Sequence, residues 1–545
     1  MAAQSERDDP DTWSLPSESV VKHGVATPRE IGLEDATPRE IQLDRVRTET
    51  EEIEADLLRG VSLRTALSGC GKHWKLPSLT SMYEIQKKSA YDLSFQAIKF
   101  HHFLSHDWKT SRWAKYGSML LLFNLPSATM ATFLAAILLG VYIGPMPHAS
   151  HNLSLAAARF LPWLVFVFVF CFWQSLRSLS RQPLVVFLDK LCIAQHDPAK
   201  KAKGIRGLSA FLDRSEELTI LWSARYFTRL WCVYELATFL RRGHTRPVKL
   251  FPVAMAWVLL LQTGAVGGAI IINELGKGIG NQDYAQSFWS FFFPWLWAIL
   301  MIFPLQYLLL GVMADVLVLD EQFKQFSIQK SQCFCCTSDH QHPDTGETLM
   351  CDRKFVYEAV KTWYKFDKTG EDETWEHFEK FDQVVRTTLR RKVMEGANSA
   401  ILPFRIILCL AVVVTAPNLV ELMTLEVEEG FGRPDLVYSV WRVIGWTSYV
   451  WVRILVAILV DVGVSIKLSK WCSRFLKSMS RVKVAAAASV LQVLLAVITL
   501  GAIHLCWDLL WNVDGSVDWF PLVMAAWLFF ITWFYGVGPC HSVCP

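Results

Sequence analysis

The sequence predicts a multi-pass α-helical membrane protein with about eight spans, a small cytosolic α/β domain with a parallel sheet, and a cytosolic helical domain that contains Cys and His. Three observations support this fold class. The 545 residues have a mean hydropathy of +0.26, and 52% are hydrophobic while only 19% are charged. Long stretches lack any charge, and the basic residues gather between them. This composition excludes a disordered protein and a disulfide scaffold.

The expected spans are stretches of about 20 apolar residues, the length that crosses a bilayer core of about 30 Å. Paired by short loops, they form four hairpins: Gly117 to Tyr142, Phe160 to Leu176, Leu250 to Ile272, Phe288 to Val312, Ile401 to Leu422, Val437 to Ile466, Val484 to Cys506 and Trp519 to Val537. The sixth stretch contains Arg453 and Asp461. An ionised group at the depth of Arg453 is costly, so we expect Arg453 to face the bundle interior, with Asp461 or Gln492 of the next span as its partner.

The sides of the membrane follow from the loops. The loop between the third and fourth hairpins carries six cations: Lys467, Lys470, Arg474, Lys477, Arg481 and Lys483. Loops within the hairpins carry at most one, so the positive-inside rule places both termini in the cytosol. The net charge is +3, and the basic residues gather in the loops assigned to the cytosolic side. We therefore expect the lipid bilayer as a partner and no nucleic acid.

This topology divides the chain into ten segments. They are a disordered N-terminal segment (1–60), a cytosolic segment whose first strand lies near 102–108 (61–116), membrane hairpin 1 (117–176), the main α/β block (177–249), hairpin 2 (250–312), the Cys/His helical domain (320–397), hairpin 3 (401–466), a basic cytosolic loop (467–483), hairpin 4 (484–537) and a C-terminal tail (538–545).

Residues 183–253 have the pattern of an α/β fold. A short apolar run ends at Asp189, as buried parallel strands do, and similar runs cover 217–223 and 247–253. Helical spacing connects these runs, with a helix expected from about Thr228 to Arg241. Alternating strands and helices predict right-handed crossovers and a parallel sheet.

These residues resemble a Toll/interleukin-receptor (TIR) domain. The resemblance rests on four motifs in order: His102 to Trp108, Val186 to Asp189, the passage from Ile205 to Tyr226, and Trp-Cys-x-x-Glu-Leu at Trp231 to Leu236. Two spans stand where the first helix of that family is expected, and a third span replaces its last strand and helix. The resemblance therefore implies a split TIR-like domain docked on the membrane.

The resemblance also implies a function. Enzymatic TIR proteins cleave NAD with a Glu at the position of Glu235, and Phe103, Ser105 and Trp231 would line the substrate site. Other members only assemble, so self-association through this domain is expected too. We therefore expect a membrane signalling or sensor protein with NAD as a substrate. The alternatives are a transporter or channel, based on Arg453 and Asp461, and a non-catalytic scaffold.

A Cys-rich stretch in residues 333–351 has the spacing of a metal site. Cys333 and Cys336 form a Cys-x-x-Cys pair, His340 or His342 follows, and Cys351 completes a Cys₃His set suited to structural zinc. Cysteines acylated near the membrane and free thiols are the two alternatives.

Overall fold

The computed structural model describes residues 54–75, 90–145, 148–241, 246–277, 284–341, 346, 348, 351–363, 375–391, 393–394, 404–430 and 458–512. The expected tail at 538–545 lies outside these residues, as does most of the expected N-terminal segment. Leu57 and Leu58 already belong to the core, with 4% and 6% of their surface exposed. The α/β domain therefore includes residues before the boundary at residue 60 that composition predicts.

Among the described residues, six helices are long and apolar enough to cross a membrane: Leu125–Ile143, Arg159–Ser180, Val253–Asn273, Phe292–Lys324, Phe404–Thr424 and Arg481–Ile498. They belong to α4 (Leu125–Ile143), α5 (His148–Ser180), α10 (Val253–Lys277), α11 (Tyr284–Lys324), α16 (Phe404–Gly430) and α18 (Arg481–Asn512). They overlap the first to fifth and the seventh predicted stretches. The eighth stretch, and the sixth up to residue 457, lie outside the described residues, so the count of eight stays a prediction.

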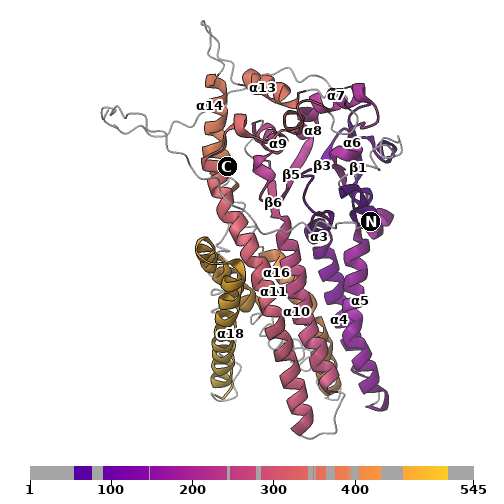
Figure 1. Cartoon of the computed structure of the whole chain (residues 1–545). Helices are drawn as coiled ribbons and strands as arrows, with labels where there is room; N and C mark the ends of the chain where they lie inside the picture. Colours follow the sequence, from indigo (N-terminus) through magenta and orange to yellow (C-terminus); the bar gives the residue numbers. More distant parts are fainter. Residues whose placement is uncertain are drawn as a thin grey trace, which may run out of the picture. The chain divides into compact units, whose positions relative to one another are not determined.

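Helix α11 connects the long helices with the α/β domain (Figure 1). It has 41 residues, and at 1.5 Å per residue it is about 60 Å long, roughly twice the thickness of a bilayer core. Near its end Phe323 packs against Phe227 of the α/β domain, with ring centroids 4.5 Å apart. The sheet and the Cys/His region lie at the same end of the long helices (Figure 1).

The sheet has six strands in the order β2-β1-β4-β3-β5-β6. Four of them are parallel: β3 (Phe100–His106), β4 (Val185–Phe187), β5 (Ser215–Trp222) and β6 (Val248–Pro252). In chain order these four are arranged 2-1-3-4, which is the order of flavodoxin-like doubly wound sheets. The strands expected near 102–108, 183–189, 217–223 and 247–253 are all present.

The prediction of a purely parallel sheet is wrong at one edge. There β1 (Arg59–Ser62) pairs antiparallel with β4, and β2 (Phe95–Gln96) pairs antiparallel with β1. Strands of four and two residues are too short to produce an alternating pattern that sequence reasoning can recognise. The sheet is therefore mixed.

Short helices and long apolar helices form the connections between the strands of the sheet. From β3 the chain passes through α3 (Arg112–Phe123), α4 and α5 to β4, so two long helices stand in the first crossover, as predicted. From β4 it continues through α6 (Asp189–Cys192), α7 (Pro198–Arg206) and α8 (Leu208–Asp213) to β5. The 3₁₀ turn η3 (Tyr226–Thr228) and α9 (Leu230–Arg241) lead to β6, which runs directly into α10.

Four aromatic rings form the centre of the core on the side of the sheet that α8 covers. The ring of Phe187 stacks on Phe103 at 4.5 Å and contacts Phe211 at 4.5 Å and Phe100 at 6.4 Å. All four are at most 1% exposed. Elsewhere α1 (Leu63–Gly71) and the turns η1 (Lys72–Trp74) and η2 (Tyr91–Leu93) complete the domain.

Close packing between long helices depends on small and polar residues. A Cβ atom on Gly140 of α4 would lie 2.4 Å from Cβ of Met423 and 3.0 Å from the carbonyl of Val420 on α16, so only glycine permits this approach. At the junction of α3 and α4, the buried Asn124 donates to the carbonyl of Phe170 and accepts from Gln174, both at 2.8 Å.

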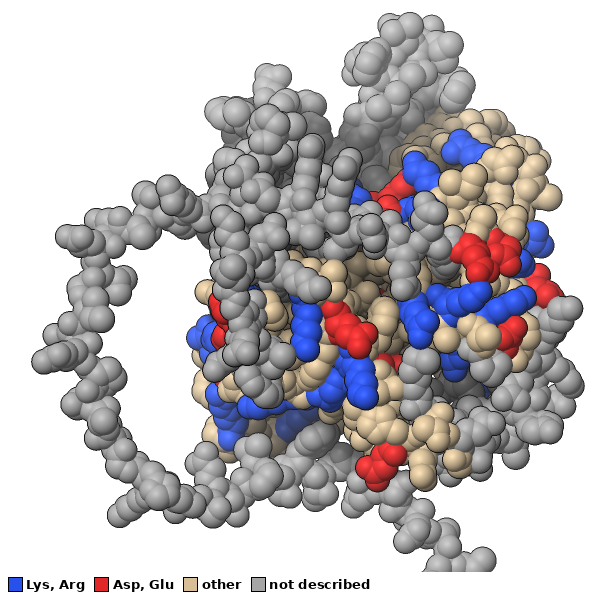
Figure 2. All heavy atoms as spheres, turned by 90° about the horizontal axis from the view of Figure 1, so that it is seen from above, with Lys and Arg blue, Asp and Glu red and all other residues tan. Residues whose placement is uncertain are grey.

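The Cys/His region is built from short elements after α11. They are η4 (Ile328–Lys330), α12 (Phe334–Thr337), α13 (Asp352–Trp363), α14 (Trp375–Val384) and the π-turn η5 (Val385–Leu389). The last described part contains a helix over 458–472, the turn η6 (Ser473–Lys477) and α18. Viewed from above, Lys and Arg are interspersed with Asp and Glu on the described surface (Figure 2).

Candidate functional site

A hydrogen-bonded group of Ser105, Tyr226 and Glu235 lies at the carboxyl end of β3. The hydroxyl of Ser105 lies 2.5 Å from the Tyr226 hydroxyl and donates to Oε2 of Glu235. Ser105 and Tyr226 are buried, while Glu235 on α9 is half-buried. In doubly wound sheets, ligands bind at the carboxyl ends of the strands. The binding point lies where the strand order reverses, between the first strand and the neighbour on its other side. The neighbours β3 and β5 form that point here.

Burial is the main influence on the Glu235 carboxyl group. It raises the pKa of Glu235 to about 8, with a further rise from the negative charge of Asp189, while the Ser105 hydroxyl and Arg229 oppose the shift. At pH 7 the Glu235 carboxyl group is therefore protonated in most molecules. A carboxyl group whose pKa lies near neutral pH can exchange protons with a bound substrate or water.

An ion pair joins β3 to the start of α9. Asp107 is 1% exposed and accepts from Nη1 of Arg229 at 3.1 Å. Arg229 immediately precedes α9, so this pair holds the beginning of the helix against the carboxyl end of β3. No sequence pattern indicates Arg229 as a site residue, because ion pairs between distant segments leave no local pattern.

A second polar group lies beside the carboxyl ends of β3 and β4. Lys115 is fully buried, and its ammonium donates to the carbonyls of Asp107 and Trp108 at 3.3 and 3.4 Å. Burial lowers the pKa of Lys115 to about 8 and raises that of Asp189 to about 6. The indole of Trp108 donates to Asp189 at 2.9 Å. The ring of Trp108 contacts that of His106 with centroids 4.6 Å apart, and burial lowers the pKa of His106 well below its usual range.

The two aromatic residues expected to line a substrate site lie elsewhere. Phe103 is 1% exposed and stacks on Phe187 in the core. Trp231 points toward α13, where its indole donates to Oδ2 of Asp352 at 3.0 Å and its ring stacks on Phe355 with centroids 5.9 Å apart. The structure thus brings Ser105 to Glu235 but engages Phe103 and Trp231 in packing.

Four ligand groups of the Cys/His region converge on one point. Suitable atoms of Cys335, Cys336, His340 and Cys351 all lie within 4.8 Å of one another, and this cluster could hold a metal ion. The Cys336 sulfur lies 3.8 Å from that of Cys335, 3.8 Å from Nε2 of His340 and 3.9 Å from the Cys351 sulfur. With metal–sulfur bonds of about 2.3 Å, sulfurs in a tetrahedron are separated by about 3.8 Å.

The ligand set differs from the predicted one in one member. Cys335 takes the place that the Cys-x-x-Cys spacing assigned to Cys333. Cys333 lies 3.1 Å from the Cys335 sulfur and forms a second group of possible ligands with Cys335 and Asp352. The alternative ligand His342 lies outside the described residues. Asp339 and His340 have positive φ angles of 48° and 58°, a costly conformation for residues with side chains.

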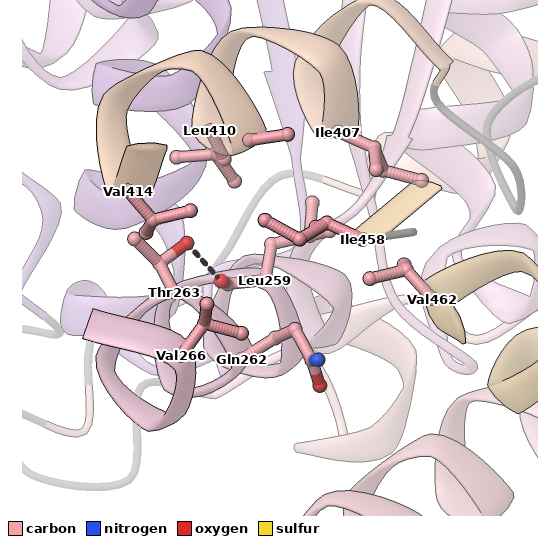
Figure 3. A pocket seen from close by; sticks show the side chains of 10 residues that line it. Leu259, Gln262, Thr263, Val266, Ile407, Leu410, Val414, Ile458 and Val462 are labelled. Atoms are coloured by element: carbon pink, nitrogen blue, oxygen red, sulfur yellow. Dashed lines mark hydrogen bonds between the residues drawn. The ribbon is translucent and has the colours of Figure 1, made fainter. Parts of the chain in front are cut away.

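The polar residues that the sequence predicts within the membrane are only partly described. Arg453 lies outside the described residues. Asp461 accepts from Nε2 of Gln492 on α18 at 2.8 Å, so these two side chains pair with each other. A hollow between α10, α16 and the helix over 458–472 is lined by apolar side chains apart from Gln262 and Thr263, and the Thr263 hydroxyl donates to its own helix (Figure 3).

Comparisons of the chain with protein-family models, with curated proteins and with solved structures find no match.

Proposed function

We propose that this chain is an integral membrane protein whose cytosolic α/β domain is a split TIR-like domain that hydrolyses NAD with Glu235. The observation that carries the proposal is the group of Ser105, Tyr226 and Glu235 at the carboxyl end of β3. The 2-1-3-4 order of the parallel strands supports it, because that order places a ligand site at this edge. The positive-inside rule places this domain and both termini in the cytosol.

The reaction needs little from the protein besides one carboxylate. The bond from the ribose to the nicotinamide nitrogen breaks, and its electron pair neutralises the pyridinium ring, so the leaving group requires no proton. Water adds to the ribose carbon and its proton passes to the Glu235 carboxylate. That carboxylate also stabilises the positive charge that develops on the ribose. Ser105 positions the carboxylate, and Tyr226 positions Ser105.

The test compares Glu235→Gln with the wild-type full chain in vesicles, clustered by a crosslinker. The product measured is nicotinamide. We expect a loss of about a hundredfold or more, because the variant lacks a charge next to the reacting ribose. Glu216→Gln is the matched control, since Glu216 is a more exposed carboxylate on β5 that pairs with Lys99. Clustered protein that leaves NAD intact, or turnover that survives Glu235→Gln, contradicts the enzyme proposal.

A non-catalytic assembly scaffold is the second candidate. It is favoured by the burial of Phe103 and by the engagement of Trp231 with α13. The transporter alternative rests on Arg453, Asp461 and Gln492, and the mainly apolar lining of the described hollow gives it no polar path there. Zinc is the metal that we propose for the Cys/His cluster, because a closed set of three thiolates and one imidazole suits it.

A further inference from the structure

The chain enters and leaves the Cys/His cluster through two residues that both contact α9. Gln332 directly precedes Cys333, and Asp352 directly follows Cys351. The candidate ligands Cys335, Cys336, His340 and Cys351 lie between these two residues. Each of the two holds a different part of the first turn of α9.

Gln332 binds the backbone at the start of the helix. Its amide donates to the carbonyl of Thr228 at 2.7 Å, and its carbonyl accepts from the amide of Leu230 at 3.1 Å. These bonds form an isolated parallel bridge between Arg229 and Gln332. The first amides of any helix lack partners within the helix, so Gln332 satisfies a group that otherwise needs water or a side-chain cap.

Asp352 binds a side chain one residue further along. Its Oδ2 accepts from the indole of Trp231 at 3.0 Å, and the rings of Trp231 and Phe355 stack with centroids 5.9 Å apart. Tyr234 adds a second contact, stacking on Trp363 with centroids 5.5 Å apart. Helix α13 thus covers one side of α9.

We propose that the metal ion bound by Cys335, Cys336, His340 and Cys351 is a clamp on the first turn of α9. The metal closes the loop between Gln332 and Asp352, and so fixes the separation of the two groups that hold the helix. Without it, the loop regains conformational freedom and the two anchors move independently, because metal binding and local folding are coupled. The ligands are thiolates and an imidazole, so the ion is a zinc-like divalent cation.

The clamp acts on the part of the helix that carries the candidate site. Arg229, paired with Asp107, immediately precedes α9, and Glu235 lies about one turn beyond Trp231. Loosening the first turn therefore changes the position of Glu235 relative to Ser105. This last step rests on the proposed NAD hydrolysis, whereas the clamp itself does not.

The experiment measures hydrogen exchange of the backbone amides of α9 in the full chain in nanodiscs, with zinc and after removal of zinc by a chelator. Metal content is measured on the same samples. Three variants are compared. Cys336→Ser removes the sulfur that contacts three other ligands, and Trp231→Phe removes the indole N–H that binds Asp352 while keeping a smaller aromatic ring against Phe355. Cys472→Ser, at a buried cysteine outside the cluster, is the control.

We expect one zinc ion per chain, and removal of zinc should speed exchange in the first turn of α9 on the order of tenfold or more. Exchange in α8 should stay unchanged. Cys336→Ser should reproduce the metal-free rates, and Cys472→Ser should behave as wild type. Trp231→Phe should speed exchange with zinc bound but add little once zinc is removed, because both changes release the same anchor.

Two results overturn the clamp. One is a chain that takes up no zinc at stoichiometric level. The other is a chain that binds zinc but whose α9 exchange is the same with and without it. Neither readout involves NAD, so failure of NAD hydrolysis leaves the clamp standing. Conversely, turnover that persists after zinc removal with faster α9 exchange separates the clamp from its effect on Glu235.

Discussion

The Glu235 group joins side chains from three elements of the α/β domain, whereas the ligands of the Cys/His cluster all lie within residues 335–351, and different forces hold the two sites. Ser105 sits on β3, which is hydrogen-bonded to β4 on one side and β5 on the other and backed by buried aromatic rings. Around the cluster, the described chain contributes the four-residue α12, an isolated bridge between Gln341 and Thr348, and residues with positive φ. A site on a sheet keeps its shape when nothing is bound. A site on short turns depends on the metal ion that its thiolates and imidazole bind.

The largest expected effect breaks this comparison on the side of the sheet. Phe187→Ala removes the ring that contacts Phe100, Phe103 and Phe211, and should destabilise the α/β domain by about 3–5 kcal/mol. The measurement is the free energy of unfolding of the domain, followed by near-ultraviolet circular dichroism in detergent. The zinc content per chain should fall only slightly, although the α/β domain is destabilised. If the destabilised variant also lost its zinc, the two sites would fold as one unit.

A smaller effect distinguishes the two possible ligand sets of the cluster. Cys335→Ser should weaken zinc affinity by at least about a hundredfold, because it removes a thiolate that bonds the metal directly, while Cys333→Ser should have little effect. Affinity is measured by competition with a chromogenic chelator on the full chain. The reverse ranking would restore the Cys-x-x-Cys set that the sequence predicts.

The smallest expected effect concerns the pH dependence of turnover. With a pKa of about 8, roughly a tenth of Glu235 is ionised at pH 7 and roughly nine-tenths at pH 9. If the ionised form reacts, the rate should rise about tenfold between these values and level off above the pKa. Ser105→Ala should move the midpoint upward, since the hydroxyl that stabilises the carboxylate is lost. A flat profile would show that Glu235 does not limit the reaction.

Sequence reasoning succeeds where the pattern is local. The apolar runs at 183–189, 217–223 and 247–253 are strands because buried parallel strands need apolar residues on both faces. Six long apolar stretches are helices for a similar reason, since their composition alone favours burial or a bilayer. The resemblance predicts that Ser105 and Glu235 belong to one site, and the structure brings them into hydrogen-bonding contact.

What the sequence misses depends on contacts between distant segments. Trp231 and Asp352 are 121 positions apart, and neither residue type predicts contact with the other. No sequence pattern predicts the pairing of β1 with β4 either. The sequence does not predict Cys335 as a ligand, because the spacing rule assumes that the first and last cysteines of Cys-x-x-Cys bind together. The short helix α12 begins inside this motif, so the structure groups the adjacent Cys335 and Cys336 instead.

The direct passage of β6 into α10 at Val253 has a consequence for access to the site. Because β3, β4 and β5 run parallel to β6, the carboxyl ends of all four strands point the same way, toward the long helices (Figure 1). In the proposed topology this edge faces the lipid headgroups. An anionic dinucleotide is depleted within about 10 Å of a negatively charged leaflet at physiological salt. Lipid composition would then change the apparent KM without any lipid touching Glu235.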